Sequence, residues 1–547
     1  MNTSAWDCFV RSFLEGYFEH FPTFGSSVGR HDFDGRLPDW SAESLADKVE
    51  WLRAQRAVAS SFAALDDRRT LEREHLIAQL DTDLFWLVDA EWPFRNPIFY
   101  TGPLDPGLYL TRNYAPLAQR MRAYIDYAKA VPRAAEQIRA NLRTPMPRSF
   151  AQLGRQTLGG LGDYFEIEVP PIFATVDDPA LQAELRAANA RAAAAMRELG
   201  AWFAAQEEVA GMDGYALGAE RFERMLFATE RVDVPLAALE AAGRRDLERN
   251  LAALREACAA LAPGKPIADC VAAVQAEKPA EGPVEAARRQ LAGLRRFIEE
   301  NELVSIPGNE EARIEEAPPY QRWNAAYMDI PGPYDRHLPS TYYIAPPDPS
   351  WTPEERAAYL PGEADLLFVT IHEVWPGHFL QFLHSHRSES DPGRLFVGYG
   401  FAEGWAHYAE ELMWEVGFGA GDPRLHIGQL QNALLRNVRF LVAIGLHTGR
   451  MTVEEAETMF RDLAFQDPGN ARQQAARGTF DPAYLNYTLG KLMIRKLRDD
   501  WSAPRGGRAA WRDLHDRLLS FGGPPIPLVR RVILGREDSR PTDVILT

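Results

Sequence analysis

The residues best suited to chemistry lie in segment 371–378, which reads Ile-His-Glu-Val-Trp-Pro-Gly-His. A histidine followed directly by a glutamate opens the HExxH signature. In that signature two histidines one helical turn apart bind Zn²⁺, and the glutamate acts as a general base on water. Here His378 follows His372 by six residues instead of four. In a continuous helix, residues six apart are rotated by roughly 240° and separated by roughly 9 Å, so their imidazoles could not meet one ion.

Pro376 and Gly377 supply a way to bring the two histidines together. Proline lacks an N–H and clashes with the carbonyl four residues earlier, here that of His372, while glycine tolerates backbone angles that other residues avoid. We therefore predict that the helix is interrupted at these two residues and that the bend returns His378 to the face of His372 and Glu373. The segment is then an HExxH motif with Pro-Gly inserted before its last histidine. A chance His-Glu pair near another histidine is common, so the motif alone leaves the metal site open.

A second polar stripe could complete the site. Catalytic zinc needs three protein ligands and an open position for water. Glu403, His407 and Glu410 occur at i, i+4 and i+7 of a largely apolar helical segment, and buried carboxylates need partners. We predict that Glu403 is the third metal ligand and that His407 and Glu410 hydrogen-bond to the ligands or stabilise the fold. We assign Glu411 and Glu415 to a solvated polar face.

Three segments carry a resemblance to a known family: HEVWPGHFLQ (372–381), FAEGWAHYAEEL (401–412) and YLNYTLGKLMIRKLRDDW (484–501). Together they resemble the bacterial "domain of unknown function 885" family, a metallopeptidase-like group related to the gluzincin zinc peptidases. The resemblance runs over nearly the whole chain, from GRHDFDGRLPDWS (29–41) to LHDRLLSFGGPPIPLVRRVI (514–533).

The resemblance implies a gluzincin-like site that holds one Zn²⁺ ion. Its ligands would be His372, His378 and Glu403, and Glu373 would be the general base. Gluzincins often stabilise the tetrahedral oxyanion with a tyrosine hydroxyl or a histidine, and Tyr487 is our candidate for that role.

Further candidates surround this set. Tyr484 is the second choice after Tyr487, although a core tyrosine with a satisfied hydroxyl is the alternative for either one. Arg439 and Lys491 could receive a substrate carboxylate, the alternative being that both are simply solvated. Tyr343 is a candidate for contact with the substrate.

The chain departs from the family pattern at one place. Many members have Asp-Thr before the Gly-x-His of a later helix, where this chain reads Ala443-Ile444-Gly445-Leu446-His447. This chain therefore lacks any role that the acid has in the family, and the resemblance gives only weak support for a functional role of His447.

The expected fold class is mainly α: a large multi-helix, gluzincin-like fold with a small β-sheet beside a deep active-site cleft. Long helices are predicted over 178–206 and 235–261, where Asp178-Pro179 supplies an N-cap and a first-turn proline. Segment 164–169 alternates like a strand. A peptide could add as a further strand beside the small sheet, or the sheet could merely pack on helices. The sheet's strands are expected within 312–316, 323–328 and 340–345.

Length and composition bound the domain organisation and the partners. At 547 residues the chain is too long for one ordinary core. A Pro-, Ala- and Gly-rich connection from 264 to 285 suggests a helical scaffold lobe over 1–262 and a catalytic metal-binding lobe over 263–547, and we expect the two lobes to form one integrated unit. The balance of 60 basic and 77 acidic residues, a net charge of −17, disfavours nucleic acid and anionic membranes as partners.

Cysteine usage and the N-terminus bear on location. The three cysteines show no CxxC spacing, so a disulfide framework is not expected. The N-terminus has no basic and apolar signal, and no run approaches the roughly 20 apolar residues of a membrane span. These features predict a cytoplasmic protein.

Taken together, the sequence predicts a zinc peptidase that uses metal-activated water and acts on a peptide or a small amide. Another divalent metal, such as Mn²⁺ or Co²⁺, could replace Zn²⁺. Two other hypotheses stay open: a zinc amidohydrolase acting on a non-peptide small molecule, and a non-catalytic helical binding protein whose histidines are structural. The oligomeric state cannot be inferred from the sequence.

Overall fold

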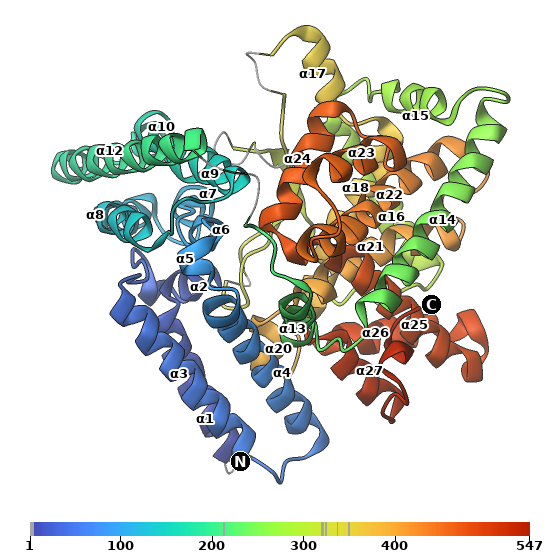
Figure 1. The fold of residues 1–547 in the computed structure, drawn as a ribbon, viewed down its shortest axis with the longest axis horizontal. Coiled ribbons are helices and arrows are strands. Elements are labelled where there is room, and N and C mark those ends of the chain that lie inside the picture. The colour runs from blue at the N-terminus through green and yellow to red at the C-terminus, as the bar shows by residue number, and fades with distance from the viewer. Residues whose placement is uncertain are drawn as a thin grey trace. The chain divides into compact units, whose positions relative to one another are not determined.

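The computed structural model describes residues 5–209, 211, 214–318, 322, 325–335, 337–347 and 351–546. The chain is mainly helical with one small sheet (Figure 1), which confirms the predicted fold class. It divides into two compact units: Met1–Ala216 with Pro331–Leu338, and Leu217–Ile330 with Pro339–Thr547.

Unit 1 is built from helices. Its elements are α1 (Ala5–His20), α2 (Pro22–Ser27), η1 (His31–Phe33), α3 (Ala42–Ser61), α4 (Asp67–Leu84), η2 (Phe85–Asp89), α5 (Trp92–Arg95), α6 (Ile98–Thr101), α7 (Gly107–Thr111), α8 (Leu117–Asn141), α9 (Arg148–Gly154), η3 (Arg155–Gly159), α10 (Leu161–Ile167), α11 (Val169–Phe173) and α12 (Pro179–Val209). The Asp178 side chain accepts a hydrogen bond from the Leu181 amide at the start of α12, so the predicted helix is confirmed. The strand predicted over 164–169 is wrong, because α10 packs on α12 there and buries Tyr164 and Phe165.

The segment Pro331–Leu338 belongs to unit 1 through contacts near His31. The amide of Tyr334 donates to the carbonyl of Val28 over 3.1 Å. The imidazole of His31 lies between two carboxylates, 3.1 Å from Asp34 and 3.1 Å from Asp335. These contacts connect two parts of the chain that are some 300 residues apart in sequence.

Unit 2 holds the predicted chemistry. Its helical elements are α13 (Ala219–Glu230), α14 (Leu236–Leu261), α15 (Ile267–Ala276), α16 (Pro283–Glu300), α17 (Pro353–Tyr359), α18 (Glu363–Glu373), α19 (His378–Ser385), α20 (Asp391–Leu395), α21 (Tyr399–Glu415), α22 (Pro423–His447), α23 (Val453–Leu463), α24 (Pro468–Phe480), η5 (Pro482–Leu485), α25 (Asn486–Ser502), η6 (Ala503–Arg505), η7 (Gly507–Ala510), α26 (Trp511–Ser520), α27 (Ile526–Leu534) and η8 (Pro541–Val544).

Helix α22 is the central element of unit 2. It begins after Asp422, whose side chain accepts a hydrogen bond from the amide of Arg424, and nearly all of its residues from Ile427 to His447 are buried. Helices α14, α18, α21, α24 and α25 pack against it, and Figure 1 shows it among them. A helix that is buried on every side places any charged residue it carries inside the protein.

The sheet of unit 2 has three strands in the order β1-β3-β2, with β1 (Arg313–Glu316) parallel and β2 (Ala326–Asp329) antiparallel to β3 (Thr341–Ile344). All three strand predictions are confirmed, although Trp323 and Asn324 of the second lie outside the described residues. Every residue of the central strand β3 is buried.

The division into units differs from the lobes expected at 262/263. Helix α14, expected in the N-terminal lobe, packs along α22 and belongs to unit 2. The expected connection over 264–285 contains a helix, α15, whose Cys270, Val271 and Val274 are buried. The apolar residues that these helices bury place them in unit 2, so that the two units divide after Ala216. Composition alone does not show this burial.

Candidate metal centre

The two histidines of the motif lie on separate helices. Helix α18 ends at Glu373, and α19 begins at His378 after four non-helical residues. A Cβ atom at Gly377 would overlap the carbonyl oxygen of His372, so only glycine allows the chain to turn this closely. The Gly377 amide donates to the carbonyl of Ile371 over 3.0 Å. The helix is thus interrupted at the place that Pro376 and Gly377 predict.

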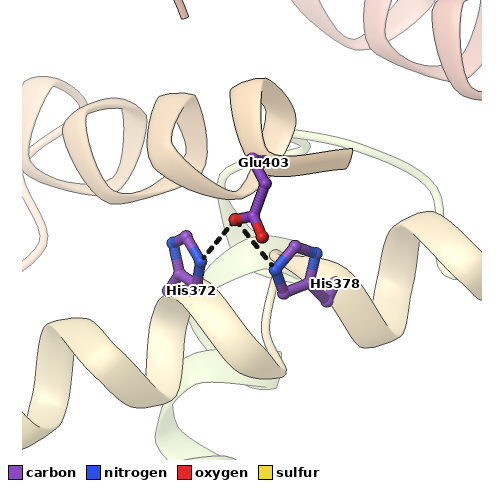
Figure 2. A group of neighbouring side chains, drawn as sticks. All are labelled: His372, His378 and Glu403. Carbon is purple, nitrogen blue, oxygen red and sulfur yellow. Dashed lines mark ion pairs between the residues drawn. The ribbon is translucent and has the colours of Figure 1, made fainter. Parts of the chain in front are cut away.

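The interruption brings His372 and His378 together with a carboxylate from a third helix. The ring centroids of the two histidines are 4.8 Å apart and nearly perpendicular. Glu403, near the start of α21, places its Oε2 3.3 Å from Nε2 of His372 and 3.4 Å from Nε2 of His378 (Figure 2). We call these three residues the metal-binding cluster, since their donor atoms all lie within 4.8 Å of one another.

The dimensions of this cluster fit a divalent metal. Two ligands of a tetrahedral zinc ion with bonds of about 2.1 Å lie about 3.4 Å apart, which matches both histidine-to-carboxylate distances. Glu403 Oε2 is buried and accepts no hydrogen bond, so a cation would supply the partner that it lacks. The side chains of His378 and Glu403 are 14% and 19% exposed, so water can reach the centre.

Glu410 and Arg436 fix the orientation of His372 from behind. Nδ1 of His372 donates to Glu410 Oε1 over 2.6 Å, and Arg436 donates to the other oxygen of Glu410 over 3.0 Å. With the proton on Nδ1, the lone pair of Nε2 points to the metal-binding cluster. Carboxylates that hydrogen-bond to a ligating imidazole in this way raise its basicity.

The electrostatics of the cluster favour positive charge at its centre. Burial and the Arg436 charge both act to lower the pKa of His372, but the carboxylates of Glu403 and Glu410 outweigh them and raise that pKa to about 9. Burial acts to raise the pKa of Glu403, but His378 and His372 hold it well below its usual range. A proton or a metal ion between these groups is stabilised by the same carboxylates.

Glu373 is the last residue of α18 and follows the ligand His372 directly. It is buried, and burial raises the pKa of its carboxyl above the ordinary value for glutamate. The phenol of Tyr342, on the sheet strand β3, interacts with Glu373 and lies beside Thr370 of α18. A buried carboxylate beside a metal site is placed to take a proton from water and to return it.

Tyr487 lies next to the cluster. Its ring centroid is 6.2 Å from that of His372, and the rings are nearly parallel. The guanidinium carbons of Arg436 and Arg439 lie 5.6 Å and 5.1 Å from the same ring centroid. Tyr399, one helical turn before Glu403, contacts the Tyr487 ring at a centroid distance of 5.9 Å.

Other candidates lie farther from the cluster or face elsewhere. His407 is fully buried, with Nδ1 3.8 Å from Glu410, and contacts the cluster only through that residue. The hydroxyl of Tyr484 lies against Gly478 of α24 and Leu446 of α22, and Nε2 of His447 bonds the carbonyl of Gly478 over 2.7 Å. These last two side chains belong to the packing of α22 on α24.

Tyr343 is on the opposite face of the sheet from the cluster. Successive side chains of a strand point to opposite faces, and Tyr342 is the one directed to α18. Tyr343 packs with Ala317, Ala345 and Tyr327. The structure thus corrects the prediction, because Tyr342 and not Tyr343 is the tyrosine directed to α18.

Glu411 was assigned to a solvated face, and this prediction is wrong. The residue is only 8% exposed, and its carboxylate pairs with Arg249 at 2.7 Å and with Lys491 at 3.2 Å. Lys491 is itself fully buried in these ion pairs, so it is not free to receive a substrate. Glu415 is exposed, as expected, and pairs with Arg498.

The sequence analysis missed Arg436, Tyr342 and Tyr399. A signal for Arg436 was present, because Asn432, Arg436 and Arg439 occur at i, i+4 and i+7 of an apolar helix, the same stripe criterion that selects Glu403. The directions of the two tyrosines depend on the strand's facing and on the start of α21, which the sequence pattern alone does not set.

The fold and the cluster together define a class: a large helical protein in which two imidazoles and a carboxylate lie close enough together to hold a metal ion. Residues 22–533 match the family described as "Bacterial protein of unknown function (DUF885)", and the chain belongs to this family. The family resemblance in the sequence is thereby confirmed. No curated protein matches the chain.

Two solved structures share the fold over 97% of this chain. One is described as a "putative lipoprotein of unknown function from Shewanella oneidensis", with a TM-score of 0.80, 22% identity and 100% of its own chain covered. The other is "the putative lipoprotein from Colwellia psychrerythraea", with a TM-score of 0.79, 17% identity and 99% of its chain covered. At these identities the likeness shows the fold alone.

A third structure, the "M32 carboxypeptidase from Deinococcus radiodurans R1", matches more remotely. Its TM-score is 0.38 at 14% identity, with 90% of this chain and 95% of that chain covered. A likeness at this level carries no argument about function.

The predicted cytoplasmic location is contradicted by the two lipoprotein descriptions. A lipoprotein is attached to a membrane by its lipid, so we withdraw the cytoplasmic prediction and assign no location. Within the described part of the chain, no helix has the length and apolar character needed to cross a membrane.

Proposed function

We propose that this protein is a metal-dependent hydrolase that cleaves amide bonds, and that its substrates are peptides. The observation that supports the proposal is the convergence of His372, His378 and Glu403 on one point, directly beside the buried Glu373. Three protein ligands leave a tetrahedral ion one position for water, which distinguishes catalytic from structural zinc sites.

The chain's own residues would perform the proton transfers. A divalent metal held by the cluster supplies a Lewis acid that polarises a carbonyl and acidifies water. Glu373 takes a proton from the attacking water and passes it to the leaving nitrogen, and its raised pKa suits both steps. Tyr487 donates a hydrogen bond to the oxygen on which negative charge develops. Glu410, neutralised by Arg436, keeps His372 in the tautomer that binds metal.

The donor set restricts the metal. Two imidazole nitrogens and one carboxylate oxygen suit Zn²⁺ best, and Mn²⁺ or Co²⁺ can also take such ligands. Elemental analysis of the purified protein should find one divalent ion per chain, and the His378→Ala variant should lose it.

The Glu373→Gln variant tests the proposal directly. We expect it to retain the metal and to lose turnover by about a hundredfold to ten-thousandfold, the usual contribution of a general base. The measurement is kcat on a peptide library, with metal content determined on the same sample. Glu363→Gln is the matched control, since Glu363 is the exposed first residue of the same helix and pairs with Arg289 at the surface.

Two outcomes would contradict the proposal. A Glu373→Gln variant that cleaves as fast as wild type would show that Glu373 is not the base. A metal-loaded wild-type protein that cleaves acylated small molecules but no peptide would show that the substrate class is wrong while the hydrolase chemistry stands.

A further inference from the structure

Arg439 is a buried cation without a carboxylate partner among the described residues. It lies on α22 and is 8% exposed. Its Nε donates to the amide oxygen of Gln474, on α24, over 2.8 Å, and its guanidinium carbon is 5.1 Å from the ring centroid of Tyr487. Among the described residues its two terminal nitrogens have no hydrogen-bond partner, and neither belongs to the fully enclosed polar atoms that lack one. A guanidinium that offers unused donors toward solvent from a buried position is suited to bind an anion.

Each of the two arginines near Arg439 has a carboxylate partner, which Arg439 lacks among the described residues. Arg436 pairs with Glu410 at 3.0 Å, and Arg477 pairs with Asp481 at 2.9 Å. Burial lowers the pKa of Arg439, and the charge of Arg477 lowers it further. Buried charges are normally paired, because an isolated one is expensive to remove from water. Since no carboxylate of the described residues pairs with Arg439, a negative charge on a ligand could serve as its partner.

Arg439 lies close to the metal-binding cluster. The ring of Tyr487 is 5.1 Å from the Arg439 guanidinium carbon and 6.2 Å from the His372 ring. The guanidinium and the imidazole can therefore be no farther apart than the sum of these two distances. Since an extended chain advances about 3.3–3.6 Å per residue, a separation within this limit corresponds to no more than about three residues of a bound peptide.

We propose that Arg439 binds the free terminal carboxylate of the substrate, so that the enzyme removes no more than about three residues from the carboxyl end of peptides. This inference rests on the hydrolase function proposed above and specifies its substrate class: amides with a free carboxylate close to the scissile bond, N-acyl amino acids included. Water adds across the C–N bond, with its hydroxyl on the acyl carbon and its proton on the released amine. The Arg439 guanidinium takes no part in these transfers and positions the substrate by a charge-assisted pair.

The test compares two forms of one substrate on the full-length, metal-loaded protein. The probe is a mixture of N-acetylated hexapeptides with random final residues, prepared once as free acids and once as carboxyl-terminal amides. Hydrogen bonds to charged groups contribute about 1.5–3 kcal/mol, so wild type should prefer the free acids by about 10- to 100-fold in kcat/KM. In the Arg439→Gln variant this preference should fall to about one, because kcat/KM for the free acids should fall by about 10- to 100-fold more than kcat/KM for the amides.

Two further variants separate binding of the carboxylate from a structural role. Arg439→Lys keeps the charge and should restore part of the preference, which a purely structural loss would not do. Arg472→Gln removes an exposed arginine from α24 and should leave the preference as in wild type. Metal content and thermal unfolding, measured on each variant, report whether the fold is intact.

The proposal is overturned if wild type cleaves acids and amides equally well, or if Arg439→Gln lowers both rates by the same factor. If wild type cleaves neither form, the hydrolase function fails, and the carboxylate site is then decided by calorimetry with the same two peptide mixtures. Tighter binding of the free acids that disappears in Arg439→Gln would support the site, and equal binding of acids and amides would overturn it.

Discussion

Glu410 and Glu411 are consecutive residues of α21, yet their carboxylates serve two buried polar clusters of different kinds. Glu410 is fully buried and holds His372 toward the metal-binding cluster, with Arg436 as its counter-charge. In the metal-binding cluster, the ligand atom Glu403 Oε2 makes no hydrogen bond. The ligand atoms of this cluster lie close together, but they do not hydrogen-bond to one another.

Glu411 belongs to what we call the ion-pair cluster, made of Asp246, Arg249, Glu411, Lys491 and Arg495. Lys491 lies 2.6 Å from Asp246 and 3.2 Å from Glu411. Arg249 bonds both oxygens of Glu411 and the second oxygen of Asp246. All four carboxylate oxygens of this cluster therefore have a cationic partner.

The difference between the two clusters shows how a candidate functional site can be distinguished from a buried polar cluster that stabilises the fold. Both clusters bury several charges, so burial of charge alone does not mark function. The ion-pair cluster is closed in the sense that every one of its carboxylate oxygens has a cationic partner, and it joins α14, α21 and α25. The metal-binding cluster is open, because within the described part of the chain no hydrogen-bond donor reaches the buried Glu403 Oε2.

Lys491→Met should break the closed cluster with the largest effect on stability. Removing the fully buried Lys491 leaves Asp246 Oδ2 without its cationic partner, and breaking a buried ion pair in this way lowers the free energy of unfolding by about 3–5 kcal/mol. Urea unfolding measures this loss, and the folded variant should still bind one metal ion per chain.

Lys496→Met is the matched control for that experiment, because Lys496 lies on the same helix and pairs with Asp500 near the surface at 2.6 Å. Its loss should lower the free energy of unfolding by only about 0.5 kcal/mol. Equal destabilisation by the two substitutions would mean that the closed cluster is not a special source of stability.

Acid should weaken the closed cluster through Asp246. Burial acts to raise the pKa of this carboxyl, but Lys491 and Arg249 lower it to about 2. Because this is below the ordinary value of 3.8, the contribution is fully present above about pH 4 and is lost as the pH falls toward 2. A shift of this size corresponds to about 2.5 kcal/mol.

The measurement is the difference in free energy of unfolding between wild type and Asp246→Asn across this pH range. The difference should narrow by about 2.5 kcal/mol as the pH falls from neutral toward 2. A difference that stays constant with pH would show that the ionisation of Asp246 does not contribute.

The sequence predicts the gathering of the metal-binding cluster because its causes are local. Pro376 and Gly377 interrupt the helix within the motif itself, and the i, i+4, i+7 stripe marks Glu403 before any fold is known. The three strands and the long helices α12 and α14 likewise follow from local periodicity and turn residues. These features require no knowledge of which elements pack together.

The sequence could not predict features that depend on packing between distant elements. Glu411 looks like a surface residue until α14 and α25 bring Arg249 and Lys491 against it. Tyr342 and Tyr343 point to opposite faces of the sheet. Which of them lies near the metal-binding cluster depends on the face that α18 covers. The division into units after Ala216 likewise depends on α14 lying along α22.

Separate substitutions of the neighbouring glutamates, Glu410 and Glu411, give the most specific test of the difference between the two clusters. Glu410→Gln removes the charged partner of His372 and should weaken metal binding about tenfold to a hundredfold, as is usual when such a partner is lost. Glu411→Gln, one residue away, should lower the free energy of unfolding and leave metal affinity as in wild type. Competition with a metal chelator measures the affinity, and urea unfolding of the metal-free proteins measures stability. If both substitutions change metal affinity alike, the two clusters act as one unit, and the distinction between open and closed does not hold.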